Sequence, residues 1–393
     1  MIKSTEQELL KNHVCMIPFK HIEMFKDRAT LCCATWLKKE LVYPKDENGK
    51  YDYNVWNSEG AREIRQSILD GNYKYCDKQI CPHLNSLIST GITDRGIFVK
   101  KDDTEFPYYD NDNIKIDDDS YVKNTPGSLN FTFDWSCNFK CPSCRVDTIM
   151  AKPDEVKEID GIVDFINKTY SDNCKKILIT GSGDPFASKS FRKFLFNFEP
   201  SNWPELKSIQ LITNGKLFNK KNWGLMKKAQ PYVKIVDVSI DAGTKDTYEN
   251  KTRLGGHWET LIENLRFIST IKTIDFFRIS YVVQNDNYTE IEQALELVHS
   301  IFKERITDNV DSKKVVMYFG YINQWPHLTD DDMKRMDVSN PNHPNHTDFV
   351  TYIKRAEKWR DRIHIQSNWN HLLHVGENKI GSSLWKMKQR SKE

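Results

Sequence analysis

Short apolar segments alternate with longer amphipathic segments from residue 129 onward, and this alternation limits the fold more than any other feature. The apolar segments have the length of buried strands, and the segment 153–170 repeats its apolar residues with helical spacing. The predicted strands are 129–133, 175–180, 208–213, 233–240, 277–283 and 314–322. Five of them precede a helix, which predicts an α/β fold with a parallel sheet, either open or curved into a partial barrel.

Four polar or glycine-containing turns follow the first four predicted strands. They are the cysteine-rich loop 137–144, "TGSGDPF" at 180–186, "TNG" at 213–215 and "SIDAG" at 239–243. Ligands of parallel sheets gather at the carboxyl ends of the strands. We therefore expect these turns to form one site.

The loop "FDWSCNFKCPSCR" carries Cys137, Cys141 and Cys144 and offers no fourth cysteine nearby. A structural zinc ion binds four protein ligands, so a zinc site at this loop would require a distant His or Cys as the fourth ligand. A four-iron cluster held by three thiolates leaves one iron open to N and O donors of a small molecule. Reduced thiols without a metal are the third reading.

The composition argues for a globular chain in the cytoplasm. The 393 residues are 12% aromatic and carry a net charge of +2, and they contain no basic tract, apolar span or secretion signal. We therefore expect no nucleic-acid or membrane partner. Nine cysteines, an odd number, are unlikely disulfides in a reducing compartment, and their clustering predicts metal binding.

The remaining segments predict four parts. Residues 1–90 hold a second cysteine group and a helix at 58–69 that Ser58 caps, and residues 91–125 form an acidic linker. Residues 126–325 form the strand–helix domain, and 326–393 are a C-terminal extension.

The C-x3-C-x2-C loop after the first strand resembles the radical S-adenosylmethionine (SAM) superfamily, and the resemblance extends over about residues 125–325. It implies a partial (βα)6 barrel in which Cys137, Cys141 and Cys144 hold a [4Fe–4S] cluster that binds SAM. Reductive cleavage of SAM would then give a 5′-deoxyadenosyl radical that abstracts hydrogen from a substrate. An electron donor such as flavodoxin or ferredoxin is implied.

The same resemblance implies residues that contact SAM. Gly181, Gly183 and Asp184 would meet the amino group of the methionine moiety. Ser239 and Asp241 would lie near the ribose or carboxylate, and Arg253 would pair with the carboxylate. The sequence departs from the family at Ser143, where an aromatic residue is usual, and Phe139 is a candidate to compensate.

The first cysteine group resembles the SPASM/Twitch module of the same superfamily. The implied ligands of an auxiliary [4Fe–4S] cluster are Cys15, Cys32 or Cys33, Cys76 and Cys81. Full ligation would make this cluster an electron conduit or a structural element, and structural zinc is the alternative. The module usually follows the barrel, whereas here it precedes it.

These features predict a radical SAM enzyme of oxidoreductase or isomerase type, whose catalytic residues the sequence does not assign. Only fourteen residues precede Cys15, so we expect no leader-recognition domain and favour oxidation or epimerisation of a small molecule or sugar. The alternatives are a peptide-modifying radical SAM enzyme and a non-catalytic iron–sulfur or zinc protein.

Overall fold

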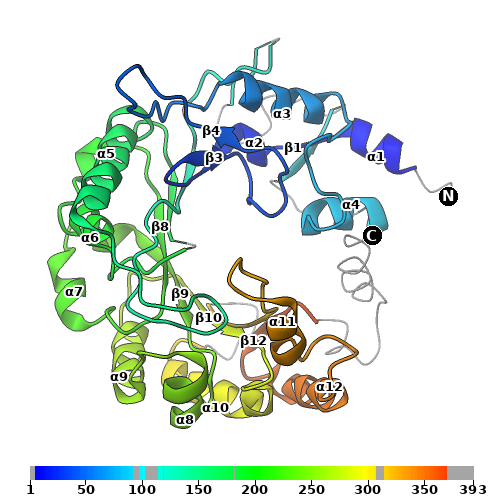
Figure 1. The fold of residues 1–393 in the computed structure, drawn as a ribbon, viewed down its shortest axis with the longest axis vertical. Coiled ribbons are helices and arrows are strands. Elements are labelled where there is room, and N and C mark those ends of the chain that lie inside the picture. Colours follow the sequence, from blue (N-terminus) through cyan, green and yellow to red (C-terminus); the bar gives the residue numbers. More distant parts are fainter. Residues whose placement is uncertain are drawn as a thin grey trace. The chain divides into compact units, whose positions relative to one another are not determined.

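The computed structural model describes residues 5–91, 97–101, 114–117, 119–180, 182–306 and 314–369. The chain divides into two compact units, which Figure 1 colours along the sequence. Unit 1 comprises Met1–Asp134, Asp154–Gly181 and Glu199–Lys207, and unit 2 comprises Trp135–Pro153, Ser182–Phe198 and Ser208–Glu393. The linker residues 92–96, 102–113 and 118 and the C-terminal residues 370–393 lie outside the described part.

Unit 1 contains the N-terminal elements and two strands of the predicted barrel. Its helices are α1 (Glu6–Asn12), α2 (Ile17–Lys20), α3 (Glu59–Leu69), α4 (Pro82–Thr90), α5 (Pro153–Thr169) and η1 (Pro200–Asn202). Its strands are β1 (His13–Cys15), β2 (His21–Met24), β3 (Arg28–Thr30), β4 (Leu41–Val42), β5 (Phe98–Lys100), β6 (Ser128–Phe131) and β7 (Lys176–Ile179). The predicted Ser58 cap is confirmed, since its hydroxyl accepts a hydrogen bond from the Ala61 N–H.

The N-terminal segment contributes a strand to the same sheet as β6. The strand order in unit 1 is β4-β3-β2-β6-β7, in which β2 and β7 run parallel to β6, and β3 and β4 continue antiparallel. Strands β1 and β5 form a separate antiparallel pair. Strand β2 is as short as β6 and β7, but its segment "HIEM" includes a histidine and a glutamate and lacks an apolar run, so the sequence did not reveal this strand.

Unit 2 contains the remaining barrel elements and the C-terminal segment. Its strands are β8 (Ser208–Thr213), β9 (Val233–Ser239), β10 (Phe276–Val282), β11 (Val315–Gly320) and β12 (His364–Ser367). Its α-helices are α6 (Lys189–Phe196), α7 (Lys220–Leu225), α8 (Lys245–Thr247), α9 (Trp258–Ser269), α10 (Ile291–Phe302), α11 (Asp330–Met336) and α12 (His346–Arg355). Its shorter turns are η2 (Gln230–Tyr232), the π-helix η3 (Tyr248–Thr252), η4 (Tyr288–Glu290) and η6 (Ala356–Trp359).

Strands β8, β9, β10, β11 and β12 of unit 2 pair in this order and are all parallel. Helices α9 and α10 lie on one side of β9 and β10 (Figure 1). Phe277 of β10 packs against Phe302 of α10 with ring centroids 5.1 Å apart, so this side of the sheet forms the core of unit 2.

The six predicted strands are all present, as β6 to β11, and the predicted α/β class with mostly parallel strands is confirmed. Strand β12 is an addition that the sequence did not reveal. Among the described helices, none combines the length and the apolar character that a bilayer span requires.

The turn after β9 packs directly on the start of α10. The Glu290 carboxylate accepts hydrogen bonds from the N–H groups of Gly243 and Thr244 at 2.8 and 3.0 Å. It also accepts from the hydroxyls of Thr244 and Thr247 at 2.8 and 2.6 Å. A Cβ atom at Gly243 would lie only 2.7 Å from the Glu290 carbonyl oxygen and 2.9 Å from the Ala294 nitrogen. Only glycine allows this approach.

Gly243→Ala should therefore destabilise the chain by about 1–3 kcal/mol, because a methyl group must displace backbone atoms of α10. Urea unfolding monitored by circular dichroism measures the loss. Gly224→Ala in α7 is the matched control, since no atom lies within 4 Å of the added Cβ. Equal unfolding midpoints for both variants would show that the turn does not pack on α10 this closely.

Candidate cluster and cofactor site

Three of the four turns predicted to converge meet within unit 2, around the buried carboxylate of Asp184, and the fourth turn carries Asp241. One carboxylate oxygen accepts from the Thr213 hydroxyl at 2.7 Å and from the Asn214 N–H at 2.9 Å. The other accepts from the N–H groups of Phe186 and Ala187 at 2.9 and 3.1 Å. The Asp184 N–H donates to the Ser136 carbonyl at 2.9 Å, so this residue joins the cysteine loop, the turn after Ser182 and the end of β8.

The cysteine loop is fixed by backbone hydrogen bonds on both sides. The Cys137 N–H donates to the Ile149 carbonyl at 2.7 Å, and the Lys140 N–H donates to the Leu254 carbonyl at 3.0 Å. Cys137 and Cys141 are buried, and Cys144 is half-buried. The loop is thus held in place without any bound group.

Each of the three sulfurs lies within hydrogen-bond distance of a different side-chain N–H. The Asn214 amide lies 3.8 Å from the Cys137 sulfur, and the Arg253 guanidinium lies 3.6 Å from the Cys141 sulfur. The Arg145 guanidinium lies 3.5 Å from the Cys144 sulfur. Donors aimed at sulfur stabilise thiolates, the form in which cysteine binds metal.

Burial works against the thiolate form of these cysteines. It raises the pKa of the Cys141 thiol to about 11, and the positive charge of Arg253 offsets only part of this increase. Burial also raises the pKa of Cys137, and the Asp184 carboxylate adds to the increase. Buried thiolates therefore need a cationic centre, so the donor set fits a metal cluster.

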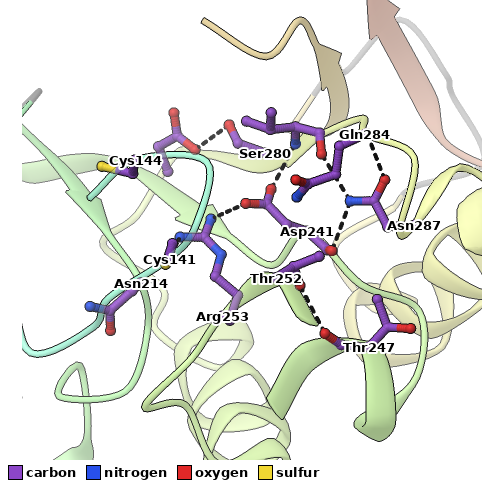
Figure 2. Close-up of polar contacts among 12 residues, drawn as sticks. Cys141, Cys144, Asn214, Asp241, Thr247, Thr252, Arg253, Ser280, Gln284 and Asn287 are labelled. Carbon is purple, nitrogen blue, oxygen red and sulfur yellow. Dashed lines mark hydrogen bonds and ion pairs between the residues drawn. The ribbon is translucent and has the colours of Figure 1, made fainter. Parts of the chain in front are cut away.

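Arg253 and Asp241 form a buried ion pair beside the cysteine loop (Figure 2), with an N–O distance of 2.8 Å. The exposed fractions of the two side chains are 11% and 3%. Asp241 also accepts from the Val282 N–H at 2.7 Å and adopts a positive φ of 47°, an uncommon conformation for a residue other than glycine. The pair therefore connects the Cys141 sulfur to the end of β10.

Three buried polar atoms near this pair have no hydrogen-bond partner in the described structure: Arg253 Nε, Gln284 Nε2 and the Tyr248 hydroxyl. Gln284 lies near Asp241 in Figure 2. Its backbone N–H donates a hydrogen bond to the Asn287 side chain at 2.8 Å, whereas its side-chain Nε2 has no partner in the described structure. An unpaired buried polar group costs about 1–3 kcal/mol. The site thus retains donors for a polar ligand, as the amino-acid moiety of SAM requires.

Residues 136–298 match the model of the radical SAM superfamily. The chain carries a radical SAM domain. The match begins just before the three-cysteine loop and extends through β10 into α10. Together with the parallel strands, it confirms the predicted fold family. No match was found among curated proteins.

Several solved structures are similar to the chain at low identity. SuiB of Streptococcus suis, bound to the precursor peptide SuiA, is 15% identical with a TM-score of 0.40, and the match covers 64% of this chain and 50% of SuiB. The anSMEcpe protein with bound AdoMet is 19% identical with a TM-score of 0.40, covering 61% of this chain and 63% of that one. BtrN in complex with AdoMet and 2-DOIA is 13% identical with a TM-score of 0.26, covering 68% and 89%.

The chain thus spans half of SuiB and 63% of anSMEcpe. Because these identities and TM-scores are low, the assignment to the superfamily depends on the domain match.

The residues predicted to contact SAM differ from one another in burial and in hydrogen bonding. Gly181 lies outside the described residues, and Gly183 is half-buried in the turn before Asp184. Asp184 has both carboxylate oxygens engaged by protein donors, so it positions the turns. Ser239 is half-buried at the end of β9.

Phe139 is the residue predicted to compensate for the aromatic side chain that is usual before the third cysteine. The Phe139 side chain is fully buried, and its ring packs edge-on against Tyr248 with centroids 6.4 Å apart. Phe139 therefore belongs to the core behind the cysteine loop.

Arg145 is a residue of the site that the sequence analysis missed. Besides contacting the Cys144 sulfur, its guanidinium donates to the carbonyls of Trp135 and Ser182 at 2.9 and 2.7 Å. It therefore ties both ends of the cysteine loop to the turn before Asp184. The sequence did contain a signal for this role: Arg145 directly follows Cys144, so its positive charge lies next to a potential thiolate.

The second cysteine group lies in unit 1. Cys32 and Cys81 are buried, and Cys15, Cys33 and Cys76 are half-buried. Burial raises the pKa of Cys32, and electrostatic repulsion from Cys15, Cys81 and Cys76 adds to the increase. These four thiols are therefore close enough to interact.

The ion pair predicts a strong energetic coupling between Asp241 and Arg253. Asp241→Asn or Arg253→Gln alone should destabilise the metal-free chain by about 3 kcal/mol or more, because each leaves a buried charge unpaired. The double variant should lose about 2 kcal/mol less than the sum of the single losses. Urea unfolding of the four proteins measures this coupling.

The exposed pair Lys245–Glu259 is the matched control, with an N–O distance of 2.6 Å and both side chains more than half exposed. Its coupling should stay below about 1 kcal/mol. Similar couplings for the two pairs would contradict the buried placement of Asp241 and Arg253.

Proposed function

We propose that this chain is a radical SAM enzyme whose cluster is held by Cys137, Cys141 and Cys144. A [4Fe–4S] cluster with one open iron supplies reductive cleavage of bound SAM and hence a 5′-deoxyadenosyl radical for hydrogen abstraction. The observation that carries the proposal is the set of three thiols in one fixed loop, each facing its own N–H donor.

The side chains around the loop have distinct tasks in this proposal. Asn214 and Arg145 stabilise the thiolates of Cys137 and Cys144 through N–H···S contacts. Arg253 does the same for Cys141, and its unpaired Nε is available for the carboxylate of SAM. Gln284 offers a further unpaired donor. Asp184 and Asp241 keep these donors in position.

We further propose that Cys15, Cys32, Cys76 and Cys81 hold an auxiliary [4Fe–4S] cluster of SPASM/Twitch type. The mutual electrostatic effects among these four thiols support this set. Cys33 also adds to the increase in the pKa of Cys81, but its sulfur lies 3.2 Å from the Thr35 hydroxyl. Thiolates of a tetrahedral zinc ion lie about 3.8 Å apart, given Zn–S bonds of about 2.3 Å.

The spacing of potential metal ligands bears on the choice between iron and zinc. Among the described residues, which include all nine cysteines, the only triad with ligand atoms within 4.8 Å of one another is Glu249, His257 and Glu259. Neither cysteine group has three sulfurs this close together among the described residues, so metal analysis of the protein decides between iron and zinc.

An auxiliary cluster with four protein ligands would accept or relay an electron from a substrate radical, which favours oxidation or epimerisation of a small-molecule or sugar substrate. Peptide modification is the competing reaction. A cytoplasmic location and a flavodoxin- or ferredoxin-type electron donor complete the proposal.

Anaerobic reconstitution should give about eight irons per chain, followed by release of 5′-deoxyadenosine on addition of SAM and a strong reductant. Replacement of Cys137, Cys141 and Cys144 by Ala should remove about four irons and abolish the release. Iron analysis and chromatography of the nucleoside products measure the two effects.

The matched control is Cys174→Ala, which removes a buried thiol outside both groups and should retain both properties. Cleavage of SAM by the triple variant would refute the assigned cluster ligands. Zinc in place of iron would support the non-catalytic alternative.

The adjacent pair Cys32 and Cys33 gives a test of the auxiliary cluster. Cys32→Ala should lower the iron content towards about four per chain, whereas Cys33→Ala should leave about eight. The reason is that Cys32 interacts with each of the other three thiols, whereas the interaction found for Cys33 is with Cys81. Iron analysis and Mössbauer spectroscopy measure the difference. The opposite order of the two variants would assign Cys33 as the ligand.

A further inference from the structure

The parallel strands of unit 2 have two unlike faces. The strand register places Arg278 beside Asp237, and Ser280 beside Ser239 and Tyr318, so these side chains share one face of the sheet. All of them except Asp237 are half-buried. Gln210 of β8 lies on the same face, where Ile212 is the register partner of Asp237. The register also places Ile212, Ile235 and the buried Val316 on this face. Its polar and partly open part, called the polar face below, is the group around Asp237 and Arg278.

The opposite face is apolar and closed. Val236 and Val238 of β9 and Phe277, Ile279 and Tyr281 of β10 are buried there. Helices normally cover both faces of a parallel sheet, whose strands then read as continuous apolar runs. In a partial barrel, however, helices cover only the outer face, so a half-exposed polar group on the other face has room for a ligand.

Arg278 is held on the polar face in one orientation. Its Nε lies 2.5 Å from the Asp237 Oδ2 atom, and one terminal nitrogen contacts the same oxygen. The Ser280 hydroxyl donates to the other oxygen of Asp237 at 2.6 Å. The guanidinium carbon lies 5.4 Å from the centroid of the Tyr318 ring. Asp237 is 3% exposed, whereas Arg278 is 34% exposed.

The contacts with Asp237 leave part of the guanidinium unused. A guanidinium has five N–H donors, and Asp237 engages the Nε donor and one donor of a terminal nitrogen. The other terminal nitrogen has no hydrogen-bond partner among the described residues. The remaining donors include the pair at the end of the fork, which matches the two oxygens of a carboxylate or phosphate.

This end of the polar face lies next to the cofactor site. Ser239 ends β9 two residues before Asp241, and Figure 2 shows Ser280 together with Asp241 and Arg253. Burial raises the pKa of Asp241, and the charge of Asp237 adds to the increase, so the two carboxylates are within electrostatic reach. A ligand on Arg278 would therefore lie near the Asp241–Arg253 pair.

We propose that Arg278 binds an anionic group of the substrate, a carboxylate or a phosphate, on the polar face of β8 to β12. Asp237 and Ser280 orient the guanidinium for this contact. The inference rests on the proposed function, since it assigns the polar face to the substrate, and it narrows the substrate class to organic anions.

Binding of two simple probes, inorganic phosphate and acetate, tests the inference on the reconstituted full-length protein. Excess SAM is present so that the probes do not compete for iron. Phosphorus and carbon NMR titrations should show saturable binding of one equivalent of at least one probe. Preference for phosphate or for acetate would assign the anionic group of the substrate.

Arg278→Gln should weaken the binding at least tenfold, because it removes the charged fork, which is worth about 1.5–3 kcal/mol. Arg278→Lys, which keeps the charge and the partner for Asp237, should recover only part of the affinity. The matched control is Arg335→Gln, which removes an exposed arginine that contacts Asp332 at 3.3 Å and should leave the binding unchanged.

Absence of saturable binding, or equal affinities of the wild type and Arg278→Gln, would overturn the inference. Release of 5′-deoxyadenosine by the wild type is measured on the same preparation. Anion binding that depends on Arg278 in a protein that does not cleave SAM would refute the proposed function and leave the anion site standing.

Discussion

The buried carboxylate of Asp184 is the contact on which the arrangement of the site depends. It brings together three segments that are far apart in sequence, through four hydrogen bonds to its oxygens and one from its own N–H. Burial raises the pKa of this carboxyl group, and the N–H of Asn214 and the hydroxyl of Thr213 counteract the increase. A residue with so many protein contacts is a poor candidate for direct contact with a ligand, and its role is to hold the cysteine loop, its own turn and the end of β8 together.

Two other carboxylates of unit 2 act in the same way. Asp241 links Arg253 to the end of β10, and Glu290 fixes the turn after β9 against α10. In each case one side chain satisfies several donors at a strand end, where the backbone groups of a turn would otherwise lack partners. The carboxyl ends of the strands are thus rigid before any cofactor binds. This rigidity lets the cysteine loop present its sulfurs in one geometry.

The sequence predicted the strands that are long and β-branched, such as β8 and β9, because burial on at least one face imposes a readable pattern. It did not predict β2 or β12, whose four residues each pair with a neighbour that is distant in the chain. The cysteine loop could be recognised from the sequence because its chemistry depends on the spacing of three cysteines within eight residues. The partners of its sulfurs could not, because Asn214 and Arg253 reach the loop only through the fold. Sequence alone also could not separate Cys32 from Cys33, since neighbouring residues differ in which way their side chains point.

Two buried aspartates of unit 2 each pair with an arginine: Asp241 with Arg253, and Asp237 with Arg278. The two ion pairs are similar, but they serve different purposes. Arg253 is almost fully buried, and its charge is shared between a carboxylate and a cysteine sulfur, so it belongs to the cofactor site. Arg278 contacts the Asp237 carboxylate through Nε and one terminal nitrogen, and the other terminal nitrogen lies on the partly exposed polar face. A pair that served only to align β9 with β10 would gain nothing from that exposure, because the register is already fixed by backbone hydrogen bonds and by the apolar face. The free edge of Arg278 therefore supports the proposed anion site, because a guanidinium fork pairs with the two oxygens of a carboxylate or phosphate.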